Sequence, residues 1–576
     1  MKYILGINAF HGDSSAAIFK DGQLIAATEE ERILRIKHWA GMPAQAIEFC
    51  LKEAGVTLRE IDAICVSRDP SVNVNKKIKH LLKHGFQLSN LYDRIKNRSK
   101  VASFEKQLAD AMDCPIEAIQ GKVQNIEHHR SHLASAFYPS PFEEAALISI
   151  DGMGDFTSTM VATAKGNDIQ VISEVNYPHS LGMFYTSFTQ YLGFPHYGDE
   201  YKVMGLAPYG KPEFLKELDP FIQYDGKYGF TLNKKFYPHF SKGVDMNWVG
   251  GSPVIGKLYS KKFEEVFGPA RKKDEELTQK HKNLATSVQR KCEEIIFQIL
   301  TRLQKDTGLK NLCISGGVAQ NSVANGKIIS NTGFDNVYVP CAGHDAGTAA
   351  GAALYYMHQN LNIKRRCPDY NPYTGYKANE AEIEQCLSQI EQPWKKASSQ
   401  SELFDKVCDC LENGGVVGWY QGRAEFGPRA LGHRSILADP RRNDVKEILN
   451  LKIKRRESFR PFAPSILKEY VDEYFENADF VPFMEKVYPI RPEKHAEIPA
   501  VTHVDGTGRL QSVDGNIEPK YYGLINRFRE RTGVPILVNT SFNENEPIVN
   551  RPQEALDCFL RTKMDMLVLE DYVVTR

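Results

Sequence analysis

The stretch YILGINAFHGDSSAAIFKDGQLIAATEEER, residues 3–32, carries the pattern that decides the fold. It predicts an apolar strand, a polar turn, a second strand, a tight Asp21-Gly22 turn and a third strand, because Asp-Gly between apolar runs is a typical hairpin signal. A second stretch, AALISIDGMGDFTSTMVATAKGNDIQVISEV at residues 145–175, repeats this order around Gly166-Asn167. The repeat predicts two related α/β halves that face each other across a cleft. Two unrelated hairpins would give the same local pattern.

A second α/β domain is predicted after one break in the chain. Residues 361–394 contain RRCPDYNPYTG, whose Pro, Asn and Gly residues favour a loop, and a new α/β pattern begins at VVGWYQG. The predicted organisation is a first domain at residues 1–360, a linker at 361–394 and a second domain at 395–576. In the first domain we expect a helix over residues 81–112. The polar, Lys-rich stretch 216–282 is expected to be an insertion near the cleft.

Composition excludes several classes of protein. A chain of 576 residues exceeds one ordinary hydrophobic core, and its 42% apolar and 25% charged residues are typical of a globular protein. Lys plus Arg equals Asp plus Glu at 72 each, so the whole chain has no electrostatic bias toward nucleic acid or membranes. The 11 Cys include no CxxC pair, which favours reduced thiols in the cytoplasm. We find no signal-peptide pattern and no run near the roughly 18 apolar residues that span a bilayer.

A metal site is predicted from two histidines and two aspartates. His128 and His132 stand four residues apart in EHHRSHLASAF, so a helix there would place both imidazoles on one face. Asp151 follows the strand ALISI, and Asp345 stands in CAGHDAG, both at expected strand-end loops. Such a set with open positions suits Fe(II) or another divalent ion that can also grip a phosphate. The alternative is a surface helix with ordinary histidines.

Two further loops carry candidate functional residues. Gly316, Gly317 and Asn321 stand in ISGGVAQN, where a strand is expected to end and a helix N-terminus could offer N–H groups to a phosphate or ribose. This loop could equally be a simple turn. In HGDSS, His11 and Asp13 could form a general base and its orienting carboxylate, although such a pair is often structural.

A basic segment in the second domain predicts an anion pocket. Residues 423–460 hold eleven Lys or Arg against five Asp or Glu, a local net charge of +6 in a neutral chain. Arg429 and Arg434 stand there among glycines, and Lys454 and Arg460 flank a stretch that ends in Pro461. Arg and Lys are the side chains suited to phosphate. Arg509 and Asn539, at later strand edges, are further candidates for the pocket. The alternatives are a nucleic-acid surface, which usually extends over a broad basic face, and a solvated charged surface.

Together these motifs resemble the O-carbamoyltransferase family typified by NodU, CmcH and TobZ. The resemblance runs over nearly the whole chain, in order. Its N-terminal motifs are HGDSSAA, EEERILRIKH, HHRSHLASAFYPSPF, IDGMGD, YKVMGLAPYG, SGGVAQN and GHDAG. Its C-terminal motifs are EFGPRALGHRSILADPR, FRPFAPS, THVDGTGRLQ and NTSFNENEPIV. It implies an α/β fold with a duplicated sugar-kinase/actin-type (ASKHA, TsaD-like) N-terminal domain and a C-terminal YrdC-like domain.

The resemblance also implies a reaction. Carbamoyl phosphate and ATP would give carbamoyl-adenylate in the YrdC-like domain, and the N-terminal domain would pass the carbamoyl group to a hydroxyl of a small molecule, such as a natural product or sugar. ATP and a divalent metal, Fe(II) with Mg(II) possible beside ATP, are the implied cofactors.

The same resemblance assigns roles to the residues. The implied metal ligands are His128, His132, Asp151 and Asp345. Carbamoyl phosphate and ATP would bind Arg429, Lys454, Arg460 and Arg509. His11 would assist hydroxyl attack.

Three alternative functions can each be compared with a feature of the sequence. Threonylcarbamoyl transfer to tRNA uses related domains, but the pI of 7.2 and the lack of a broad basic tract count against a nucleic-acid substrate. Carbamoyl transfer to a protein cysteine, as in hydrogenase maturation, goes with zinc-finger CxxC pairs that this sequence lacks. A nucleotide-binding sensor of the actin class would not need the Arg-rich segment. The sequence does not specify the acceptor or the oligomeric state.

Overall fold

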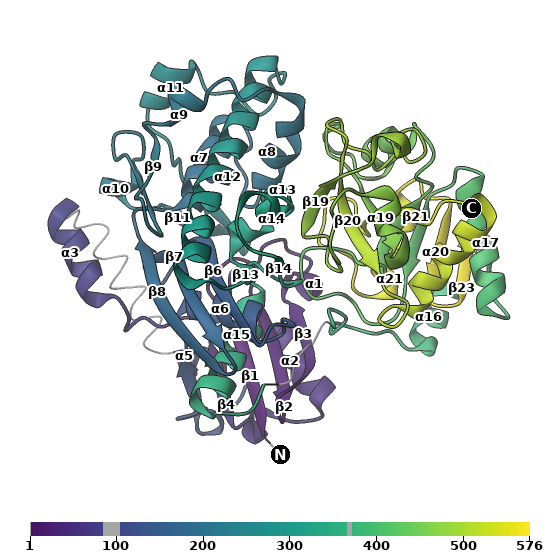
Figure 1. Cartoon of the computed structure of the whole chain (residues 1–576). Coiled ribbons are helices and arrows are strands. Elements are labelled where there is room, and N and C mark those ends of the chain that lie inside the picture. Colours follow the sequence, from purple (N-terminus) through teal and green to yellow (C-terminus); the bar gives the residue numbers. More distant parts are fainter. Residues whose placement is uncertain (1, 85–103, 366–370) are drawn as a thin grey trace. The chain divides into compact units, whose positions relative to one another are not determined.

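The computed structural model has a mixed α/β fold and describes residues 2–84, 104–365 and 371–576 (Figure 1). The chain divides into two compact units. The first unit comprises Met1–Asn321 and Ile328–Tyr370, and the second comprises Ser322–Lys327 and Asn371–Arg576. The expected α/β class is therefore confirmed.

The first sheet of the first unit contains the hairpins expected from residues 3–32. Its order is β3-β2-β1-β4-β5, where β1 pairs antiparallel with β2 and parallel with β4. The tight turn has positive φ at Asp21 (49°) and Gly22 (83°), as a two-residue hairpin requires. The strands are β1 (Tyr3–Asn8), β2 (Ser15–Lys20), β3 (Gln23–Glu29), β4 (Ala63–Val66) and β5 (Val123–Asn125).

The second sheet has the same sequence of pairings. Its order is β14-β13-β6-β7-β8, with two antiparallel hairpin pairings followed by two parallel ones. Its strands are β6 (Glu144–Gly154), β7 (Thr157–Lys165), β8 (Asp168–Asn176), β13 (Asn311–Ser315) and β14 (Asn336–Tyr338). The two stretches with the repeated pattern thus form the first three strands of each sheet.

Two helices pack between these sheets. Helix α15 (Gly347–Tyr355) contacts β1 and β2, helix α6 (His128–Phe137) contacts β6 and β13, and the two helices contact each other. The packing requires small residues, because a Cβ on Gly6 would lie 1.9 Å from the Ala349 carbonyl oxygen. A Cβ on Gly351 would lie 1.9 Å from the Ser131 carbonyl oxygen. The close contact brings the first turn of α6 near the loops at the strand ends.

Further helices cover the outer faces of the two sheets. Helix α2 (Ala44–Ala54) packs on β2 and β3, and α7 (Leu181–Tyr191) and α12 (Gln279–Thr307) pack on β6. The helix expected over residues 81–112 corresponds in its described parts to the end of α3 (Val74–His84) and to α5 (Phe104–Ala111). The rest of that expectation lies outside the described residues. Among the described residues, no helix has the length and apolar character needed to cross a membrane.

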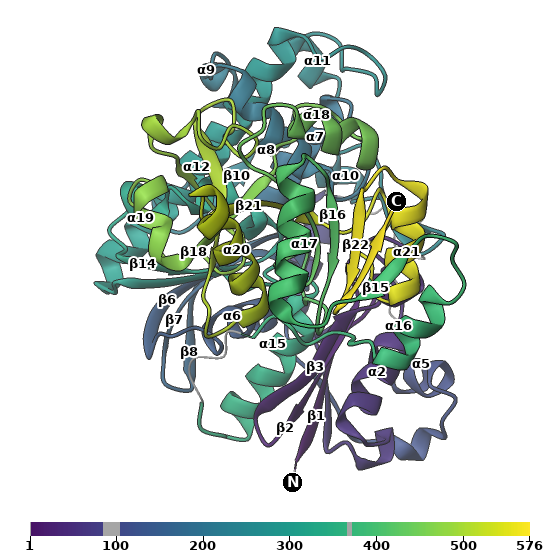
Figure 2. The same ribbon diagram turned by 90° about the vertical axis from the view of Figure 1, so that its right-hand side faces the viewer.

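The second unit is built on one nine-stranded sheet. The strand order is β15-β23-β22-β16-β17-β21-β18-β20-β19. The strands are β15 (Trp394–Lys396), β16 (Val417–Tyr420), β17 (Arg434–Ala438), β18 (Ala463–Leu467), β19 (Lys486–Pro489), β20 (Thr507–Val513), β21 (Ile536–Ser541), β22 (Met566–Leu569) and β23 (Tyr572–Thr575). Helices α17 (Gln400–Glu412) and α20 (Pro519–Thr532) contact each other on this sheet (Figure 2).

The stretch expected to be a linker contains a structured element. Helix α16 (Glu380–Leu387) lies within residues 361–394 and contacts α21 (Pro552–Arg561). Its Ile383 and Leu387 side chains belong to the hydrophobic core of the second unit. The Pro- and Asn-rich composition that suggested a linker is confined to the residues before this helix.

Candidate functional site

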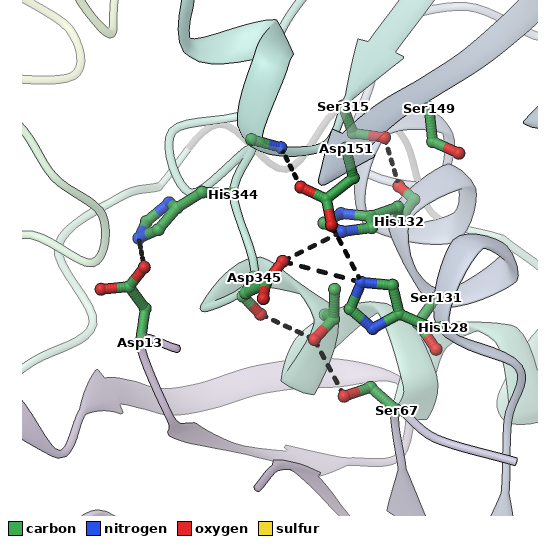
Figure 3. A network of polar contacts seen from close by, with 12 residues as sticks. Asp13, Ser67, His128, Ser131, His132, Ser149, Asp151, Ser315, His344 and Asp345 are labelled. Carbon is green, nitrogen blue, oxygen red and sulfur yellow. Dashed lines mark hydrogen bonds and ion pairs between the residues drawn. The ribbon is translucent and has the colours of Figure 1, made fainter. Parts of the chain in front are cut away.

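The two histidines and two aspartates of the predicted metal site come together in the first unit. Helix α6 begins at His128, and one helical turn separates His128 from His132, so their ring centroids lie 4.7 Å apart. Asp151 stands in β6, and Asp345 stands two residues before α15. One ligand atom from each of the four residues lies within 4.8 Å of the others (Figure 3).

The donor atoms of this cluster fit a cation. His128 Nε2 lies 3.6 Å from both Asp151 Oδ2 and Asp345 Oδ1, and His132 Nε2 lies 3.4 Å from Asp345 Oδ1. Both histidines are fully buried, and none of their ring nitrogens has a hydrogen-bond partner among the described residues. Buried polar atoms without partners are rare in folded proteins, and a metal ion would satisfy the facing Nε2 atoms.

The charges of the cluster lead to the same conclusion. Burial lowers the pKa of His128, but the Asp151 and Asp345 carboxylates outweigh it and raise that pKa to about 9. Burial and the charge of Asp151 raise the pKa of Asp345 to about 7. The Asp151 and Asp345 carboxylates therefore repel each other, and a positive charge between them would stabilise both. Imidazole with carboxylate is a ligand set for divalent first-row metals.

The Gly-rich loop after β13 holds the cluster in place. Gly317 N–H donates to Asp151 Oδ1 at 2.9 Å, and Gly316 N–H donates to the Gly343 carbonyl at 2.7 Å. Gly316 has φ of 94°, and a Cβ there would lie 2.2 Å from the Ile150 carbonyl oxygen. Asn321 exchanges amide hydrogen bonds with Gln289 of α12. These groups already have partners within the protein, so their expected contact with a nucleotide stays a prediction.

His11 lies beside the cluster, but Asp13 does not orient it. The His11 and His128 ring centroids are 4.6 Å apart. Burial and the neighbouring charge of His128 hold the pKa of His11 well below its ordinary value, which favours the neutral form. Asp13 Oδ1 instead lies 2.7 Å from His38 Nδ1, and Asp13 Oδ2 lies 4.0 Å from His344 Nε2 (Figure 3).

The partner of Asp13 corrects the expected His11–Asp13 pair. The segment before α2 folds back over the first loop, where Ser14 N–H donates to the Trp39 carbonyl and Phe10 N–H donates to the Gly41 carbonyl. These contacts bring His38 to Asp13. The sequence offers no local signal for this partner, because the two residues meet only through this fold-back.

The second unit contains a cluster of arginines. Burial, together with the charges of Arg429, Arg456 and Arg460, holds the pKa of Arg509 well below its usual range. Arg509 Nε is buried and has no hydrogen-bond partner in the part of the chain that the structure describes. Three of these residues were predicted members of the anion pocket. The fourth, Arg456, belongs to the same basic segment and was not selected from the sequence.

The other predicted members of the pocket are buried and largely engaged. Lys454 is 1% exposed, and its Nζ donates to the Ser541 carbonyl, to the Asn543 carbonyl at 2.8 Å and to Asn543 Oδ1 at 2.6 Å. The acceptors of these three hydrogen bonds are neutral groups. Asn539 Nδ2 donates to Gln511 Oε1 at 3.0 Å, while Asn539 Oδ1 is buried without a partner. A bound anion would offset the positive charge of this region.

Arg434 has a different role from its basic neighbours. It is fully buried, lies 3.6 Å over the Tyr420 ring, and donates to four backbone carbonyls, those of Tyr376, Gln421, Gly422 and His433. Its Nη1 and Nη2 donors hold loops at the end of β16, which supports a structural role for Arg434.

Comparison with known proteins adds the family. The family model described as Carbamoyltransferase N-terminus matches residues 3–354, and the model described as Carbamoyltransferase C-terminus matches residues 408–576. An uncharacterised protein of Synechocystis sp. is 40% identical over all of this chain and 97% of its own length. Nodulation protein NolNO of Sinorhizobium fredii is 37% identical over 99% of this chain and 80% of its own length. Nodulation protein NolO of Bradyrhizobium diazoefficiens is 39% identical over 78% of this chain and 79% of its own length.

Fold, sites and similarity together define the class of protein. It is a mixed α/β protein with a His/Asp cluster suited to a metal in one unit and an arginine cluster suited to an anion in the other. The chain belongs to the carbamoyltransferase family.

Proposed function

We propose that this protein is an ATP-dependent O-carbamoyltransferase that acts on a small-molecule hydroxyl. Water would hydrolyse carbamoyl phosphate to carbamate and phosphate, and carbamate would attack the α-phosphate of ATP to give carbamoyl-adenylate and pyrophosphate. The acceptor hydroxyl would then take the carbamoyl group and release AMP. The observation that carries the proposal is the arginine cluster around Arg509 in a chain of this family, because four neighbouring guanidinium groups that are each only partly exposed favour a polyanionic ligand.

The second unit would form the adenylate. Arg429, Arg460 and Arg509 would neutralise the phosphate oxygens of carbamoyl phosphate and ATP, with Arg456 as a fourth cation. Fixed positive groups in a walled site stabilise the charge that develops when carbamate meets the α-phosphate. Lys454 would add its charge while staying anchored to Asn543.

The first unit would transfer the carbamoyl group. A divalent ion held by the cluster, in our proposal Fe(II), would act as a Lewis acid toward the carbonyl or phosphoryl oxygen. His11, adjacent to the cluster and favoured in its neutral form, would accept the proton of the attacking hydroxyl. Asp13 stands in the same loop as His11 and is held by His38, and it would contact the acceptor.

We also propose that residues 1–360 form a duplicated sugar-kinase/actin-type (TsaD-like) domain. The equal order of pairings in its two five-stranded sheets supports this assignment. By the same resemblance, residues 395–576 would be a YrdC-like domain.

Two substitutions should separate adenylate formation from carbamoyl transfer. Arg429→Ala should abolish the carbamoyl-phosphate-dependent exchange of labelled pyrophosphate into ATP, and with it all product. His11→Ala should leave the exchange intact while product formation falls by roughly 10²–10⁴-fold, the range for a lost general base. If His11→Ala stops exchange and transfer equally in a folded protein, the division of labour between two sites is wrong.

A further inference from the structure

Arg68 stands at the edge of the first sheet, next to the loop that carries His11. Strand β4 ends at Val66, which pairs with Ile7 of β1, and Ser67 N–H donates to the Ile7 carbonyl at 3.0 Å. Because β1 and β4 are parallel, the residues that follow both strands emerge at the same edge. Arg68 and the His11 loop therefore leave the sheet side by side.

Hydrogen bonds on both sides of Arg68 tie it to the His/Asp cluster. Asp155 Oδ2 accepts from Asp69 N–H at 2.7 Å and from His128 N–H at 3.0 Å, so one carboxylate joins the residue after Arg68 to a predicted metal ligand. On the other side, the Thr348 hydroxyl lies 2.9 Å from Ser67 Oγ and 2.6 Å from the Asp345 carbonyl oxygen. The backbone of Arg68 is thus fixed relative to both His128 and Asp345.

The side chain of Arg68 is a partly buried cation near the Asp155 carboxylate. Among the described residues, its guanidinium makes no hydrogen bond and no ion pair. Burial lowers the pKa of Arg68, although the Asp155 carboxylate opposes this, and the charge of Arg68 in turn lowers the pKa of His11. A cation that is partly withdrawn from water and lacks an acceptor in the protein can be stabilised by an anion that arrives with a ligand, and a guanidinium group suits a phosphoryl group.

We propose that Arg68 binds the phosphoryl group of the nucleotide from which the carbamoyl group is transferred. This assignment rests on the proposed function. In the transfer step the acceptor oxygen bonds to the carbamoyl carbon, and the bond from that carbon to the phosphate oxygen breaks. The electron pair moves to the phosphate of AMP, and the hydroxyl proton moves to His11. The guanidinium of Arg68, near His11, would neutralise the charge that grows on the departing phosphate.

The direct test measures AMP binding to the full-length protein with the other anion pocket disabled. Isothermal titration calorimetry would compare Arg429→Ala with the double variant that also carries Arg68→Gln. We expect AMP affinity to fall about 10- to 100-fold in the double variant, the scale of lost hydrogen bonds to a charged group. Arg68→Lys should give an intermediate loss, because it keeps the charge but not the planar fork. Adenosine, which lacks the phosphate, should bind both proteins equally.

Activity and metal content complete the test. In the Arg68→Gln single variant, pyrophosphate exchange should stay at the parent level while carbamoyl transfer falls. Unchanged AMP affinity would overturn the proposal. So would a loss of bound metal, which would place Arg68 among the supports of the cluster, or a raised KM for the acceptor with unchanged AMP affinity. If the parent protein shows no exchange at all, the proposed function fails, whereas AMP binding still tests Arg68 as a phosphoryl site.

Discussion

Replacing Gly154 by Ala should weaken binding of the proposed metal ion without altering any of its proposed ligands. Gly154 ends β6, and a Cβ built there would lie 2.0 Å from His128 Cδ2 and 2.2 Å from His128 Cγ. Ordinary contact begins at 3.4 Å, so the added methyl group and the imidazole must separate by about 1.4 Å. The His128 ring cannot move freely, because it is fully buried against His11 and His132. Metal–ligand distances tolerate only about 0.2 Å.

We therefore expect Gly154→Ala to weaken metal binding by about 100-fold, the upper end of the range for substitutions that disturb ligand orientation. Metal content after dialysis would be measured by elemental analysis, together with the rate of carbamoyl transfer. Overpacking also costs about 1–3 kcal/mol, so pyrophosphate exchange, assigned to the second unit, would check that the protein is folded.

Gly152→Ala is the matched control. Gly152 lies in the same strand beside Asp151, yet a Cβ there would meet nothing within 4 Å. This variant should retain both metal and transfer. Parental metal content in Gly154→Ala, or an equal loss in the two variants, would refute the steric argument.

Three further predictions concern charges in the two units. Burial lowers the pKa of His38, but Asp13 raises it from 6.5 to about 9, so their pair should stabilise the fold fully below pH 6.5 and lose this contribution as the pH rises toward 9. Asp13→Asn should accordingly lower the melting temperature at pH 6 but not at pH 10, and an equal deficit at both would contradict the pairing. Arg434→Lys should cost about 2–4 kcal/mol of unfolding free energy in urea, since it breaks hydrogen bonds from a buried charged group. Arg509→Met should leave the melting temperature without ligand equal or higher, because Arg509 lies among like charges, and should abolish its rise with carbamoyl phosphate; a rise equal to the parent's would remove Arg509 from the pocket.

The local patterns in the sequence identified several elements that the structure contains. The Asp21-Gly22 turn depends on adjacent residues alone, and the structure has the hairpin there. The four-residue spacing of His128 and His132 puts both rings on one face of α6 for the same reason. Helix α16 was missed because the Pro- and Asn-rich run before it dominated the interpretation of residues 361–394.

Contacts between residues far apart in the sequence could not be predicted from local patterns. The sequence by itself determined the hairpins, the helix that carries the two histidines and the concentration of basic residues, since each depends on neighbours a few positions away. Only the tertiary structure decided that Asp13 pairs with His38, that Arg434 holds loops while Arg456 joins Arg509, and that Arg68 emerges beside His11. The physical reason is that a side chain's partner is set by which strand ends and helices pack together. Residue types and spacing do not encode that packing locally.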